Sequence, residues 1–163
     1  MTASHDISAR ELLRHTLATV AYRGNKPLRD APHDFATFCV APGSRTPGEI
    51  LAHVCDLLDW ASWMLRGEQR WVNSTPSDWA SDVSRFHAGL QTLDDHLTSD
   101  EPLRATPEKI FQGPVADALQ HIGQLTMLRR LFGSPIRGEN YHKADIECGR
   151  VGTDQAPPRV EFG

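Results

Sequence analysis

The sequence contains little cysteine. Its three cysteines, Cys39, Cys55 and Cys148, are odd in number and none forms a C-x-x-C pair. This pattern excludes a disulfide framework and a cysteine-based zinc site. Reduced thiols are typical of the cytoplasm, and we therefore expect a cytoplasmic protein.

Long hydrophobic runs are also missing. The longest uncharged apolar stretches are only a few residues, whereas a membrane-spanning helix needs about 20. Residues 1–6 (MTASHD) do not combine a basic region with an apolar block, so no secretory signal is predicted. We therefore expect no membrane partner.

The chain has no excess of positive charge. Its 17 lysines and arginines stand against 21 aspartates and glutamates, for a formal net charge of −4. Binding to nucleic acid requires cations that displace counterions from phosphates, so nucleic acid is not an expected partner. At 163 residues, with 39% hydrophobic and 23% charged residues, the composition is typical of one globular domain spanning residues 1–163.

Several catalytic sequence motifs are absent. The chain contains no G-x-S-x-G, Walker loop, G-x-G-x-x-G or H-E-x-x-H sequence. Histidine, in contrast, is abundant, with eight residues. Because imidazole is a common metal ligand, these histidines are the first candidates for chemistry.

Four segments have the apolar periodicity and the capping residues of amphipathic helices. Strand-like alternation is absent, which predicts an all-α fold, a four-helix bundle. The first helix is expected to stop at Gly24-Asn25, and Thr46 and Thr75 are expected to cap the second and third. The predicted helices cover residues 8–22, 46–66, 75–99 and 113–133.

The connections are unequal in length. Residues 25–46 form a long first connection, which would let the first two helices run in an arrangement other than simple up-down. Apolar residues in 79–97 are spaced alternately four and three apart, as in helices that pack nearly antiparallel. The tail, residues 138–163, is expected to wrap the bundle in extended form, with a short helical turn near 141–146.

His53 and the pair Asp117 and His121 are the strongest candidates for a site. His53 lies within the apolar arc of its helix, where a histidine is either a hydrogen-bonded core residue or a ligand. Asp117 and His121 are four residues apart on one helical face, either as a hydrogen-bonded pair or as two ligands. If their helices face each other, two imidazoles and one carboxylate would hold a divalent first-row metal and leave coordination positions open.

Other candidates are weaker. His142 would reach the site if the tail folds back, and His87 and His96 lie off the apolar seam and are expected to be solvated. Trp60 is either a core residue or part of a pocket wall. The pair Arg129-Arg130 either complements the dipole at a helix end or binds an anion.

Residues 46–53 (TPGEILAH) and 117–125 (DALQHIGQL) resemble the DinB/YfiT-like superfamily of metal-dependent four-helix bundles. Residues 128–135 (LRRLFGSP) and 138–141 (GENY) resemble one subgroup of it, and the resemblance covers nearly the whole chain. The family pattern is one histidine from the second helix and H-x-x-x-H from the fourth. His53 and His121 match it, and Asp117 replaces the first histidine of the fourth helix.

The resemblance implies a metal site of His53, Asp117 and His121, holding zinc, nickel, manganese or iron. Relatives include thiol transferases and a mycothiol-dependent isomerase. We therefore expect a thiol transferase or hydrolase in which the metal activates a low-molecular-weight thiol or water against a small molecule. The alternative is a non-catalytic, stress-associated bundle that binds a metal or small molecule. Superfamily members often form homodimers, for which Trp63 and Trp79 are spare aromatic residues.

Overall fold

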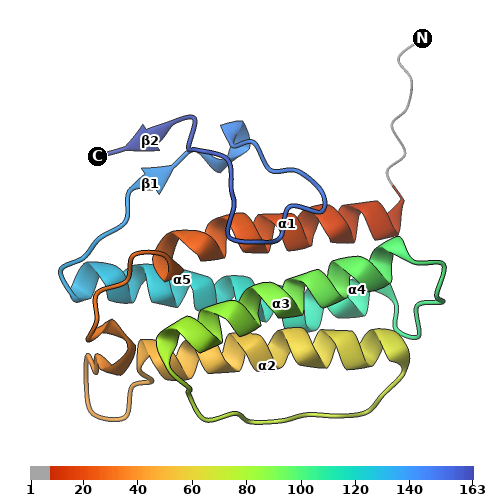
Figure 1. The fold of residues 1–163 in the computed structure, drawn as a ribbon, viewed down its shortest axis with the longest axis horizontal. Helices are drawn as coiled ribbons and strands as arrows, with labels where there is room; N and C mark the ends of the chain where they lie inside the picture. The colour runs from red at the N-terminus through yellow and green to blue at the C-terminus, as the bar shows by residue number, and fades with distance from the viewer. Residues whose placement is uncertain (1–7) are drawn as a thin grey trace.

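The computed structural model describes residues 8–163 and consists mainly of four long helices (Figure 1). A short helix and a π-helical turn lead directly into the last of them, and two-residue strands lie in the tail. The all-α prediction is confirmed. The elements are α1 (Ala9–Leu28), η1 (Phe35–Thr37), α2 (Pro47–Arg66), α3 (Trp79–Thr98), α4 (Pro107–Ile110), η2 (Phe111–Val115), α5 (Ala116–Leu131), β1 (Gly138–Glu139), η3 (Tyr141–Lys143) and β2 (Glu161–Phe162).

Helix α2 begins and ends where the sequence predicts. The Thr46 hydroxyl accepts from the Glu49 backbone N–H, and the Glu49 carboxylate accepts from the Thr46 N–H at 2.7 Å. This reciprocal capping box satisfies two backbone donors at the start of the helix. At its end, Gly67 adopts a left-handed conformation with φ of 81°, which glycine reaches without steric cost. These two caps fix the limits of the helix that carries His53.

The predicted stop of α1 at Gly24-Asn25 is wrong, because the helix continues to Leu28 with Pro27 in its last turn. Gly24 is helical and serves packing instead. A Cβ atom at this position would lie 2.7 Å from Cζ of Phe86. The missing side chain therefore allows the close approach of α3 to α1.

The starts of two other helices also differ from the prediction. The N-cap of α3 is Asp78, whose carboxylate accepts from the Ser81 N–H, so residues 75–77 belong to the preceding loop. On the other side of the bundle, helical structure begins at Pro107, before the predicted residue 113. The π-helical turn η2 contains Pro114, which has no N–H to donate. Helical structure therefore continues through Pro114, near which the sequence predicted the start of the fourth helix.

Each long helix packs against two others, α1 and α2 both contacting α3 and α5. Helices α2 and α3 run in the same direction, since Cys55 contacts Asp82 and the later Asp59 pairs with the later Arg85. Helices α1 and α3 run antiparallel, because Arg14, near the start of α1, pairs with Asp94, near the end of α3. The near-antiparallel packing predicted for residues 79–97 is therefore found against α1.

The connection that sets this topology is residues 67–78, here called the crossover strap. It returns along the length of α2 so that α3 can start beside the start of α2 (Figure 1). The first connection, residues 29–46, instead turns at one end of the bundle, and α1 and α2 run in opposite directions (Figure 1). Although antiparallel, α1 and α2 are not neighbours, because each packs against α3 and α5 instead. The expected departure from a simple up-down bundle is therefore found at the first connection, and the parallel α2 and α3 add a second departure that the sequence did not predict.

The tail, residues 138–163, is largely extended, with a 3-10 turn at Tyr141–Lys143. Strands β1 and β2 pair antiparallel, which the sequence did not indicate. Glu139 is buried, accepting from the Tyr22 hydroxyl at 2.6 Å and pairing with Lys26 at 2.5 Å. These contacts hold the tail against α1.

The prediction that His87 and His96 are solvated is wrong. The His87 imidazole is buried and its Nδ1 donates to the Val151 carbonyl at 3.0 Å, because the tail covers this part of α3. The His96 side chain is only 11% exposed. None of the helices described is both long and apolar enough to cross a membrane.

Candidate metal centre

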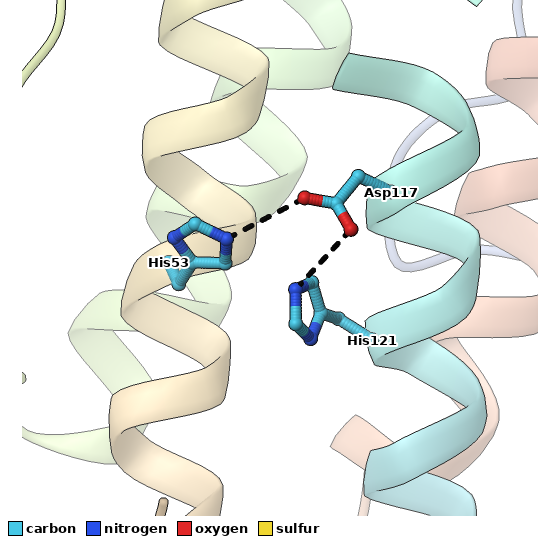
Figure 2. Close-up of side chains that lie close together, drawn as sticks. All are labelled: His53, Asp117 and His121. Carbon is cyan, nitrogen blue, oxygen red and sulfur yellow. Dashed lines mark ion pairs between the residues drawn. The ribbon is translucent and has the colours of Figure 1, made fainter. Parts of the chain in front are cut away.

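The three predicted ligands lie together between α2 and α5 (Figure 2). These two helices run antiparallel (Figure 1). His53 projects from the first half of α2, and Asp117 and His121 project from successive turns of α5. Each Asp117 oxygen faces a different imidazole: Oδ2 is 3.6 Å from His53 Nε2, and Oδ1 is 3.4 Å from His121 Nε2. The two imidazole centroids are 4.7 Å apart.

These spacings suit a shared cation. With ligand bonds of about 2.1 Å, tetrahedral coordination places neighbouring ligand atoms about 3.4 Å apart. One ligand atom from each residue lies within 4.8 Å of the others. Both carboxylate–imidazole distances exceed those usual for N–H···O hydrogen bonds. The group could therefore hold a metal ion with small movements of its side chains.

Burial favours the ligand form of His53. Desolvation lowers its pKa, and the positive charges of His121, when protonated, and Arg45 lower it further, while Asp117 opposes them. The His53 imidazole is therefore neutral at pH 7, which is the form that binds a metal.

A hydrogen bond orients the second imidazole. Nδ1 of His121 donates to the Gln124 amide oxygen at 2.8 Å, which leaves the Nε2 lone pair directed at the group. Such a partner fixes the tautomer and the ring orientation of a metal-binding histidine. Sequence reasoning missed Gln124, although its position three residues after His121 places it on the same helical face.

One tryptophan packs beside His53 and a second packs against the first. Trp71, in the crossover strap, packs edge-on against the His53 ring, with the ring centroids 5.8 Å apart. It packs in the same way against Trp60, with the ring centroids 5.7 Å apart. Ser74 anchors the strap, since its N–H and hydroxyl both donate to buried Asp56. Trp60 packs against the hydrophobic core, as its core interpretation predicted, and no local pattern in the sequence signalled Trp71 beside it.

Opposite these tryptophans, a pocket of about 540 Å³ opens beside His121. The start of α2, the segment before it and the C-terminal half of α5 form its walls. It is lined by Val40, Ser44, Arg45, Ile50, His121, Gln124, Met127, Leu128 and Leu131.

Three weaker candidates have other places. His142 is exposed and does not belong to the ligand group; the neighbouring Tyr141 packs against Tyr22 instead. Trp79 is not spare, because its indole N–H donates to the Leu28 carbonyl and its ring packs against Phe35.

Arg129 is buried and structural. Its guanidinium donates to the carbonyl oxygens of Pro27, Arg29 and Ser134, so it joins the ends of α1 and α5. A cation in the last turn of α5 that donates to carbonyl oxygens at helix ends agrees with the dipole interpretation. Arg130, in contrast, is exposed.

Comparisons of the chain with protein-family models, with curated proteins and with solved structures gave no match. The functional argument therefore rests on the geometry of the site.

Proposed function

We propose that the protein is a divalent-metal-dependent enzyme of the DinB/YfiT-like superfamily that acts on a small molecule, as a thiol transferase or a hydrolase. The observation that carries this proposal is the convergence of His53, Asp117 and His121 from two helices, at 3.4 and 3.6 Å across the carboxylate. A three-residue ligand set is typical of catalytic sites, because it leaves positions open.

The donor set fits a first-row divalent metal, since it combines neutral imidazole with carboxylate oxygen. A metal bound here would supply an acidified thiol or water, nucleophilic near neutral pH. Asp117 is the most open of the three, with 40% of its side chain exposed. Trp71 packs beside His53, and Gln124 holds the tautomer of His121.

One observation supports the non-catalytic alternative, a stress-associated bundle that binds a metal or a small molecule. Within residues 8–163, the ligand group contains no fourth acid or base. An enzyme would draw its proton transfers from Asp117 or from solvent, whereas a binding protein needs none.

Metal content tests the proposal. Protein purified without a histidine tag and supplied with zinc, nickel, manganese and iron should carry about one ion per chain by emission spectroscopy. Occupancy below about 0.2 for every metal contradicts both the enzyme and the metal-binding alternative. Turnover of the loaded protein with a thiol and an electrophilic dye separates the two, because only the enzyme consumes the dye above the rate of free metal and thiol.

A further inference from the structure

The pocket beside His121 has an apolar interior and an apolar mouth. Val40, Met127 and Leu131 line it while each is about half exposed, at 46%, 52% and 55%. Large apolar side chains gathered at one opening mark a binding surface. The volume of about 540 Å³ lies in the range of pockets for small molecules.

Arg45 is the only permanently charged side chain that lines this pocket. It directly precedes Thr46, the N-cap of α2, which fixes its backbone at the mouth. Among residues 8–163, no carboxylate lies within ion-pair distance of its guanidinium, and no hydrogen bond engages it. Arg45 is exposed, whereas the guanidinium of Arg85 is paired with Asp56 and Asp59.

We propose that this pocket takes the apolar body of a small-molecule substrate whose carboxylate pairs with Arg45. A planar guanidinium matches a carboxylate with two parallel hydrogen bonds, and a single positive charge suits a single negative one. The apolar walls hold the body, and the side that contains His121 and Gln124 leads to the metal group. The assignment of this ligand as substrate rests on the proposed function; the binding site itself does not.

The molecule provides a matched comparison on its other side. Arg130 is an exposed arginine of α5, three residues after Met127, and lines a separate pocket of about 320 Å³ with Arg23 and Arg137. Replacing it removes the same charge from α5, a helix that lines the pocket beside His121, without changing any residue of that pocket.

The test uses metal-free, full-length protein and two probes of one shape, 4-phenylbutyrate and its neutral amide. Binding is followed by NMR chemical-shift titration. We expect shifts at the backbone amides of Gln124 and Met127, and tighter binding of the acid than of the amide. The substitution Arg45→Gln should weaken the acid about tenfold and leave the amide unchanged, and Arg130→Gln should change neither.

Three results would overturn the inference: equal affinity for acid and amide, loss of acid binding in Arg130→Gln instead of Arg45→Gln, or shifts that avoid Gln124 and Met127. A separate zinc titration of the parent protein keeps the two proposals distinct. Zinc binding without the Arg45 effect retains the metal site and rejects the pocket, whereas the Arg45 effect without zinc binding retains the pocket and rejects the enzyme.

Discussion

Asp117 is the residue on which the candidate metal centre depends most, because its two oxygens face two different imidazoles. It is also the position where the proposed superfamily has the first histidine of its H-x-x-x-H pattern. A carboxylate keeps ligand capacity at this position but changes its charge and its preference among metals.

Replacing Asp117 tests its role directly. Asp117→Ala should remain folded, since the partly exposed side chain contributes little apolar contact, and should bind zinc far more weakly because only His53 and His121 remain. Asp117→His should retain or raise the affinity for zinc or nickel, which suit imidazole. Circular dichroism checks the fold, and calorimetric titration checks the metal. Unchanged zinc affinity in Asp117→Ala would make the carboxylate a structural partner of His121.

Gln124 should act through His121. We expect Gln124→Leu to weaken metal binding about 10–100-fold, because the imidazole loses the acceptor that fixes its tautomer. The control is Gln120→Leu, at an exposed position of the same helix. Equal zinc affinities for the two variants in a competition titration with a chelating dye would remove Gln124 from the site.

At the scale of elements, the contact of α1 with α3 depends on Gly24. Gly24→Ala should lower the free energy of unfolding, because a methyl group 2.7 Å from the fully buried Phe86 ring costs about 1–3 kcal/mol in overpacking. The gain in helix propensity recovers only about 1 kcal/mol. Urea unfolding measures the difference.

Gly123 is the matched control for this prediction. It is also helical, and a Cβ atom there meets nothing within 4 Å. Gly123→Ala should therefore raise the free energy of unfolding by about 0.5–1 kcal/mol. Equal effects of the two substitutions would show that Gly24 is not needed for close approach.

The same glycine shows where prediction from sequence stops. The boundaries of α2 were predictable because Thr46, Pro47 and Gly67 act on their own backbone. Gly24 carries the same local signal as Gly67, yet its role is set by Phe86, a residue of another helix. Local patterns locate caps, but they do not distinguish a cap from a close contact between helices.

The candidate site divides in the same way. Asp117 and His121 were predictable as a pair because one helix fixes their spacing, and His53 followed once two helices were taken to face each other. Trp71 and Arg45 were not predictable, since the path of the crossover strap and the position of the pocket depend on tertiary packing. Residues that surround a site from loops leave no periodic signal.

At the scale of the whole molecule, burial of His87 under the tail couples stability to pH. Burial lowers the pKa of His87 in the folded protein, whereas the unfolded chain has an ordinary value near 6.5. Above about pH 6.5 both states are neutral. As the pH falls below that value, the unfolded chain takes up a proton that the folded one resists, so the folded state loses stability.

The free energy of unfolding of the metal-free protein should therefore fall between pH 7.5 and 5.5. His53, whose pKa is also lowered, contributes with the same sign. His87→Asn keeps a donor for the Val151 carbonyl without a titrating group, and should make this fall smaller. Urea unfolding at pH 7.5 and 5.5 measures the fall in the free energy of unfolding for the parent and for the variant. Equal falls would exclude His87 as a source of the pH dependence.

The crossover strap has a consequence for how the chain assembles. Of the four interfaces between long helices, only that of α2 with α3 joins consecutive ones, and their parallel direction rules out a hairpin with a tight turn. The other three interfaces, α1 with α3, α1 with α5 and α2 with α5, close over long stretches of chain. Folding rates fall as contacts become less local, so this bundle should fold more slowly than an up-and-down bundle of equal length. The ligand group can form only after α2 and α5 pack together, and the whole of α3 lies between these two helices in the sequence.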